Sequence, residues 1–104
     1  MSIHSVRKIS VLIVDDHPPL RAGVRAMLEE TDDIYVLGEA GNGDEAGKLL
    51  DELRPNIILL DLKMPNFSPS AFEKWAREKY PETITLVLTA HDRNAYLANM
   101  MDAG

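Results

Sequence analysis

The sequence predicts a single α/β domain built on a doubly wound parallel sheet. Short, continuous apolar runs, which are typical of strands buried on both faces, alternate with segments whose apolar residues recur at helical spacing. This alternation of strand and helix is typical of right-handed crossovers that place helices on both faces of one sheet. Both observations therefore favour a parallel sheet between two helical layers.

Four apolar runs are expected to form the strands of this sheet. They cover residues 8–14, 34–38, 56–61 and 83–89. The last run contains Leu86-Val87-Leu88 and carries no charge, so we expect it to form an exposed edge that favours pairing with another chain.

Helices are expected after each strand. Pro18 is suited to the first turn of the first helix, and Asn42 with Glu45 and Ser70 with Glu73 have the spacing of capping boxes for the next two. The expected inward-facing residues are Leu20, Val24, Met27 and Leu28, then Ala46, Leu49, Leu50 and Leu53, then Phe72, Trp75 and Ala76, and finally Tyr96, Leu97, Met100 and Met101.

Length and composition limit the classes of protein to consider. The 104 residues suffice for one domain, which we expect over residues 7–104 after a flexible tail of residues 1–6. The formal charge of −6 argues against binding of a nucleic-acid backbone by this domain alone. No apolar run is long enough to cross a membrane, and the absence of cysteine agrees with a reducing cytoplasm, which is the expected location.

Polar side chains stand at the ends of three expected strands. Asp15 and Asp16 follow the first strand, Asp61 ends the third, and Thr89 ends the fourth. In open α/β sheets this carboxyl edge is where ligands bind. Because grouped carboxylates repel one another without a cation, the pattern predicts a metal ion. The competing interpretations are that Asp61 caps the following turn and that Asp16 caps the first helix.

Five short motifs occur in order along the chain: Val14-Asp15-Asp16-His17-Pro18, Gly38-Glu-Ala-Gly-Asn-Gly43, Leu60-Asp61-Leu-Lys-Met-Pro65, Leu88-Thr89-Ala90 and Asp102-Ala-Gly104. In these motifs the chain resembles the receiver domain of bacterial two-component response regulators. Within that family it is similar to the NarL/FixJ subgroup, whose members usually carry a LuxR-type helix-turn-helix output domain. The resemblance implies a flavodoxin-like fold with strand order 2-1-3-4.

The resemblance also implies roles for individual residues. Asp61 would accept a phosphoryl group from a sensor histidine kinase, and Thr89 would contact that group. Mg²⁺ would be held by Asp15, Asp16 and Asp61 and by the backbone carbonyl of Lys63. The domain would be a switch rather than an enzyme, and DNA would be bound only through an output domain that this chain lacks.

The family has a fifth strand with a phosphoryl-binding lysine, and this chain ends before it. We therefore expect an incomplete receiver domain that lacks the fifth strand and the last helix. Self-association is expected through the fourth-strand edge or through the helix that closes the chain. His91, two residues after Thr89, is a candidate for tuning the attack of water on the phosphoryl group.

Three other functions remain to be weighed. An interaction module with the same fold would not need phosphorylation. A haloacid-dehalogenase-type phosphatase would need an acidic residue at the position of Lys63. A dinucleotide site at Gly41–Ala46 is disfavoured because Asp44 and Glu45 place negative charge at the helix start, where the phosphates would bind. His17 is expected to be an exposed residue at the start of a helix rather than a ligand, because imidazole does not suit Mg²⁺.

Overall fold

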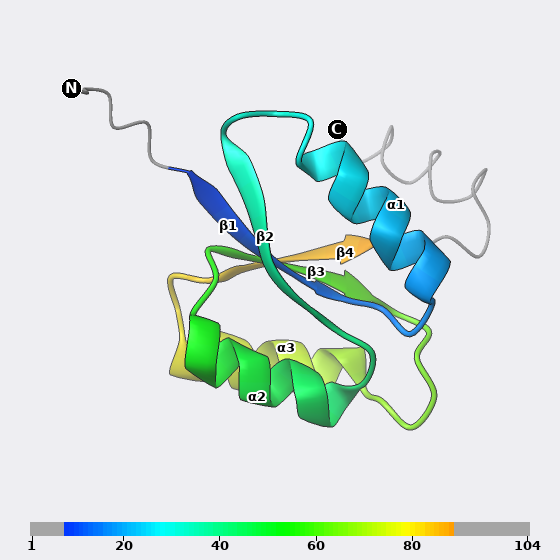
Figure 1. Ribbon diagram of the computed structural model, residues 1–104. Coiled ribbons are helices and arrows are strands. Elements are labelled where there is room, and N and C mark those ends of the chain that lie inside the picture. Colours follow the sequence, from blue (N-terminus) through cyan, green and yellow to red (C-terminus); the bar gives the residue numbers. More distant parts are fainter. Residues whose placement is uncertain (1–7, 89–104) are drawn as a thin grey trace, which may run out of the picture.

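The computed structural model describes residues 8–88, which form four strands and three helices (Figure 1). The expected tail of residues 1–6, the expected helix from Tyr96 to Gly104, and both Thr89 and His91 lie outside the described residues. The elements are β1 (Ile9–Val14), α1 (Pro18–Leu28), β2 (Ile34–Ala40), α2 (Gly43–Leu53), β3 (Ile57–Asp61), α3 (Pro69–Lys79) and β4 (Ile84–Leu88).

The four strands form one parallel sheet in the order β2-β1-β3-β4, which confirms the predicted flavodoxin-like order. Helix α1 lies on one face of the sheet, and α2 and α3 lie on the other (Figure 1). Val14 of β1 is in register with Leu60 of β3. The residues that follow these two positions therefore leave the sheet side by side.

Each face of the sheet has its own apolar cluster. The cluster on the α2 and α3 face is centred on Leu12, Val14, Ala40, Ala46, Leu50, Ile58, Leu60, Met64, Phe72 and Ala76. The cluster on the α1 face is centred on Val11, Ile13, Val24 and Val36. Strand β1 supplies both clusters through alternate residues, as expected for a strand buried on two sides.

Strand β2 is two residues longer than predicted and contains a bulge. Val11 pairs with Val36, but the next residue, Leu12, pairs with Gly38, so Leu37 is the extra residue. The bulge reverses the alternation along the strand, so that Val36 faces α1 while Ala40 belongs to the opposite cluster. A Cβ atom at Gly38 would lie 3.1 Å from Leu53 Cδ1, so glycine lets α2 pack closely here.

Helix α2 begins as predicted, with Asn42 as its N-cap. The Asn42 side chain accepts a hydrogen bond from the Glu45 amide at 2.8 Å. The Glu45 carboxylate in turn accepts from the Gly41 amide at 2.7 Å. The chain's own acidic residues therefore occupy the start of this helix, where a dinucleotide phosphate would have to bind.

Two local predictions about the other helices are wrong. Helix α3 is capped by Ser68 rather than Ser70, because Pro69, with its fixed φ, takes the first helical position. Met27 does not face the core and is 62% exposed. Only the row formed by Leu20, Val24 and Leu28 contacts the sheet, since Met27 lies on the flank of that row.

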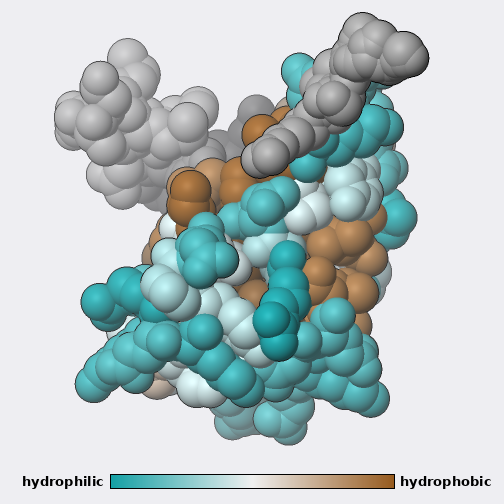
Figure 2. Space-filling view, turned by 90° about the vertical axis from the view of Figure 1, so that its left-hand side faces the viewer, coloured by the Kyte–Doolittle hydropathy of each residue, from teal (hydrophilic) through white to brown (hydrophobic). Residues whose placement is uncertain are grey.

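Strand β4 leaves apolar side chains at the surface, as predicted. Ile84, Leu86 and Val87 are exposed, and within residues 8–88 no strand pairs with the outer side of β4. Figure 2 shows hydrophobic surface at the height of the sheet, above the hydrophilic residues that cover the region of α2 and α3. The edge is therefore apolar and open to pairing as far as the described residues extend.

Candidate metal centre

Three carboxylates predicted from the sequence lie together at the carboxyl edge of the sheet. Asp15 directly follows β1, and its amide extends the strand pairing by donating to the Ala40 carbonyl at 2.9 Å. Asp61 is the last residue of β3, the neighbouring strand. Ligand atoms of Asp15, Asp16, His17 and Asp61 all lie within 4.8 Å of one another. The geometric basis of the predicted site is therefore present.

Two of these carboxylates are almost completely buried, since Asp15 is 1% exposed and Asp61 is 3% exposed. One oxygen of each is held locally: Asp15 Oδ1 accepts from the His17 amide at 2.8 Å, and Asp61 Oδ1 from the Lys63 amide at 3.1 Å. These turns fix both side chains in position. Asp61 thus caps the turn after its strand, as one interpretation predicted, and also lines the pocket.

The second oxygen of each buried acid lacks a compensating contact. Oδ2 of Asp15 and Oδ2 of Asp61 are buried without a hydrogen-bond partner among the described residues, and Oδ1 of Asp16 is buried with His17 Nδ1 3.0 Å away. Burying carboxylate oxygens without partners is costly unless a cation compensates the charge. The donor set of three carboxylates suits a hard divalent ion such as Mg²⁺. The residues present therefore fit the metal that the sequence predicts.

His17 has a larger part in the cluster than the sequence suggested. It is the N-cap residue of α1, so Asp16 does not cap this helix, and its side chain is 52% exposed as expected. Its Nδ1 atom nevertheless lies 3.2 Å from Asp15 Oδ1 and 3.0 Å from Asp16 Oδ1. The imidazole therefore borders the acidic pocket instead of pointing away from it.

Sequence reasoning missed the basic residue that holds the β1–α1 loop. Arg21 Nη1 donates to the main-chain carbonyl of Asp15 at 2.5 Å, and its Nε donates to Glu39 Oε1 at 3.1 Å. A Cβ atom at residue 41 would lie 3.1 Å from Arg21 Nη1, so Gly41 makes room for the guanidinium. Arg21 thereby connects the loop that follows β1 to strand β2.

Glu39 links this arginine to a second one. Its Oε2 accepts from Arg25 Nη1 at 2.7 Å. The hydrogen bond from Arg25 is the main reason that the pKa of Glu39 lies below its usual value, and the bond from Arg21 adds to the effect. The same contact raises the pKa of Arg25. Glu39 therefore stays ionised at a lower pH than an ordinary glutamate, and it anchors both arginines of α1 to β2.

Of the three remaining predicted site residues, one lies within the described part of the chain. Thr89 and His91 lie outside it. Lys63 lies within it, exposed in the loop after Asp61, and its amide is used by Asp61; the role of its carbonyl stays a prediction. Met64, in the same loop, is buried in the core and fixes the loop to the sheet.

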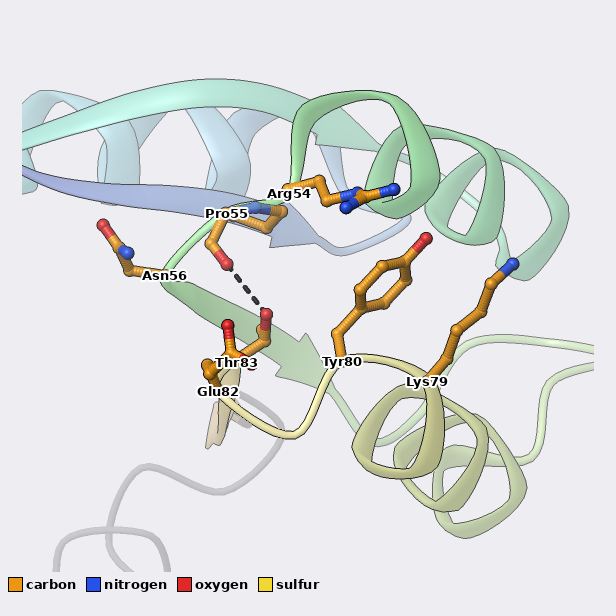
Figure 3. Close-up of a pocket in the computed structure, with 7 residues that line it drawn as sticks. All are labelled: Arg54, Pro55, Asn56, Lys79, Tyr80, Glu82 and Thr83. Carbon is orange, nitrogen blue, oxygen red and sulfur yellow. Dashed lines mark hydrogen bonds between the residues drawn. The ribbon is translucent and has the colours of Figure 1, made fainter.

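A second hollow, of about 410 Å³, lies at the opposite edge of the sheet (Figure 3). Figure 3 shows the hydrogen bond from Thr83 Oγ1 to the Pro55 carbonyl, at 2.9 Å, and the side chains of Arg54 and Tyr80 near one another. The Tyr80 hydroxyl and Lys79 both bind Asp51, which lowers the pKa of that carboxyl. This hollow gathers no set of acids and is separate from the metal centre.

None of the helices within residues 8–88 is long and apolar enough to cross a membrane.

Comparison with known families identifies the class of this domain. The model of the response regulator receiver domain matches residues 11–104, which is most of the chain. The chain therefore belongs to the response regulator receiver family. The acidic pocket at the ends of β1 and β3 lies within the matched residues.

The relatives are response regulators of the NarL/LuxR type. The transcriptional regulatory protein YdfI of Bacillus subtilis (strain 168) is 39% identical over 94 residues, which are 90% of this chain and 44% of YdfI. The chain thus spans about half the length of the curated relatives it matches.

Two solved structures show the same fold. A LuxR-family two-component response regulator from Aurantimonas sp. SI85-9A1 is 29% identical, with a TM-score of 0.75 over 93% of this chain and 69% of that one. The isolated receiver domain of RcsB from Salmonella enterica serovar Typhimurium, in the presence of phosphomimetic BeF₃⁻, is 27% identical. Its TM-score is 0.74, over 92% of this chain and 72% of that one.

Proposed function

We propose that Asp61 is the phosphoacceptor of this receiver domain and that residues 7–104 act as its switch. The observation that carries the proposal is the pocket in which Asp61 lies with Asp15 and Asp16, because Asp15 and Asp61 each bury one oxygen without a partner among the described residues. Receiver domains generally accept a phosphoryl group and do not turn over a substrate. The donor would be a histidine kinase, by family membership.

The chemistry divides between the metal and the chain. Bound Mg²⁺ would neutralise the charge of the incoming phosphoryl group. A carboxylate oxygen of Asp61 forms a bond to phosphorus while the bond from phosphorus to the donor breaks, giving an acyl phosphate. Asp15, Asp16 and Asp61 would hold the cation, with the Lys63 carbonyl as a further proposed ligand. The turn that holds Asp61 Oδ1 keeps the side chain oriented toward the pocket.

The response is proposed to pass through Thr89 to an output domain. Phosphorylation adds roughly −1.5 to −2 charge and strong acceptor oxygens. Thr89 would move to form a hydrogen bond with the phosphoryl group. His91 would affect how readily water attacks the phosphoryl group. By analogy with YdfI and the LuxR-family regulator, the output would be control of transcription through a DNA-binding domain, in the cytoplasm.

The second candidate is an interaction module that is never phosphorylated. The exposed Leu86 and Val87 favour it, because an open apolar edge can pair with a second copy of the chain. A groove of about 600 Å³ beside this edge, lined in part by Leu60, Leu62 and Val87, adds further apolar surface. Self-association through β4 would not exclude phosphorylation, so modification of Asp61 is the test that separates the two candidates.

Phosphorylation in solution tests the first candidate. The chain is incubated with Mg²⁺ and a small acyl-phosphate or phosphoramidate donor, and intact mass and peptide mapping locate the modification. We expect one phosphoryl group on Asp61, lost in Asp61→Asn and retained in Asp32→Asn, which alters an exposed acid outside the pocket. Modification of another residue, or none in the wild type, would leave the interaction module as the better account.

A further inference from the structure

We propose that the acidic pocket binds divalent transition-metal ions such as Ni²⁺ more tightly than Mg²⁺, with the Nδ1 atom of His17 as an additional donor beside the carboxylates. The pocket would then be a mixed carboxylate–imidazole site. This inference rests on the metal site of the proposed function but does not require phosphorylation of Asp61.

The first argument is the spacing of the donor atoms. Two neighbouring ligands of an octahedral ion, each about 2.1 Å from it, are separated by about 3.0 Å. His17 Nδ1 lies 3.0 Å from Asp16 Oδ1 and 3.2 Å from Asp15 Oδ1. Opposite ligands of such an ion are about 4.2 Å apart, and the four residues offer atoms within 4.8 Å of one another. Small side-chain adjustments would bring all four onto one ion.

The second argument is that the backbone holds His17 in place. Its amide donates to Asp15 Oδ1, and Pro18 and Pro19 follow it with fixed φ angles at the start of α1. Its ring does not cap the helix. The backbone of His17 is therefore held by rigid neighbours, with Nδ1 3.0 Å from Asp16 Oδ1, and little backbone entropy is lost when an ion binds.

The third argument concerns the class of ion. Mg²⁺ prefers oxygen ligands and gains little from an imidazole, whereas Ni²⁺, Cu²⁺ and Zn²⁺ bind imidazole well and have higher intrinsic affinities for mixed sites. The buried, unpartnered oxygens of Asp15 and Asp61 favour a cation in the pocket, and His17 would determine which cation gains most. A transition-metal ion in this site would compete with Mg²⁺ for the same carboxylates.

Calorimetric titration of the whole chain tests the selectivity. His4→Gln and His91→Gln are introduced together so that His17 is the remaining histidine. In this background, His17→Ala is expected to weaken Ni²⁺ binding roughly tenfold or more while changing Mg²⁺ affinity by less than about threefold. Circular dichroism checks that the fold is retained.

Pulsed electron paramagnetic resonance of the Cu²⁺-loaded chain provides a readout that does not depend on affinity. With His17 present, we expect the modulation produced by the remote nitrogen of a coordinated imidazole. The signal should disappear in His17→Ala and in His17→Gln within the same background. An unchanged signal, or no imidazole signal with His17 intact, would overturn the assignment.

The outcomes separate this inference from the proposed function. If Mg²⁺ binds and His17→Ala weakens Ni²⁺ and Mg²⁺ equally or not at all, the imidazole is not a ligand and only this inference fails. If His17→Ala tightens the binding of both ions, His17 acts as a competing cation, and the inference is wrong. If neither ion binds the wild-type chain but Asp61 is still phosphorylated, the metal site fails while the phosphoacceptor assignment stands.

Discussion

The guanidinium of Arg21 is hydrogen-bonded to the main-chain carbonyl of Asp15, with 2.5 Å between Nη1 and the oxygen. Arg21 is therefore tied to the backbone of the acidic pair rather than to its carboxylates. Because Glu39 holds the other side of the same guanidinium, β2 fixes the loop that presents Asp15 and Asp16. A residue outside the acidic cluster thus controls its geometry.

Replacing Arg21 should damage the metal site as well as the fold. We expect Arg21→Ala to lower Mg²⁺ affinity about tenfold, as loss of outer contacts often does, and stability by roughly 1–3 kcal/mol. Calorimetry and urea unfolding measure the two effects. Arg77→Ala is the matched control, because within residues 8–88 Arg77 forms only an exposed pair with Glu73. Equal Mg²⁺ affinity in Arg21→Ala and Arg77→Ala would contradict the role of Arg21.

The contribution of Glu39 should depend on pH. Its folded-state pKa is lowered, first by the hydrogen bond from Arg25, so its stabilisation is present above its unfolded pKa. That stabilisation is lost as the pH falls through the folded-state pKa. Glu39→Gln should therefore destabilise the domain near neutral pH by roughly 1–2 kcal/mol, and the difference from wild type should shrink below about pH 4.

Urea unfolding of the wild type and of Glu39→Gln, from neutral pH to below about pH 4, measures how much the charge of Glu39 contributes to the free energy of unfolding. Glu73→Gln serves as the control, because Glu73 forms an exposed i,i+4 pair with Arg77. Such pairs contribute little. A Glu39→Gln difference that stays constant from neutral to strongly acidic pH would show that the charge of Glu39 does not stabilise the fold.

Two glycines make a matched pair for packing. A Cβ atom at Gly43 would lie 2.8 Å from Phe67 Cδ1, whereas one at Gly23 in α1 would meet nothing within 4 Å. Gly43→Ala should therefore destabilise by roughly 1–3 kcal/mol. Gly23→Ala should stabilise by about 0.5–1 kcal/mol, because alanine favours a helix. Thermal unfolding measures the melting temperatures of the two variants, and we expect a decrease for Gly43→Ala and an increase for Gly23→Ala. Equal changes in melting temperature would refute the contact with Phe67.

The open edge of β4 should make the chain self-associate. We expect sedimentation at high concentration to detect dimers or larger species, and Leu86→Lys to shift them toward monomer because a charge opposes edge pairing. Met27→Lys removes an even more exposed apolar side chain (62%, against 47% for Leu86) from α1, away from this edge, and should have little effect. A wild-type chain that stays monomeric at high concentration would contradict the prediction.

The parts of the fold that depend on local patterning could be predicted from the sequence. Continuous apolar runs identified the strands, and Asn42 correctly marked the start of α2. Asp15, Asp16 and Asp61 could be grouped because parallel strands end at the same edge. These inferences need only the spacing of residues along the chain.

The parts that depend on tertiary contacts could not be predicted. The bulge at Leu37 turns Glu39 toward α1, and alternation alone would have continued through it. Arg21 and Glu39 are far apart in the sequence, so nothing in their spacing indicates that they pair. Ser68 and Ser70 both offer a hydroxyl near the start of α3, and the fixed φ of Pro69 decides between them.

The most direct test of the central claim is anomalous diffraction from crystals of the chain saturated with Mn²⁺, a stand-in for Mg²⁺. The account predicts one strong peak about 2.1–2.3 Å from carboxylate oxygens of Asp15, Asp16 and Asp61. No peak at these three side chains, or a peak bound only by other residues, would contradict it.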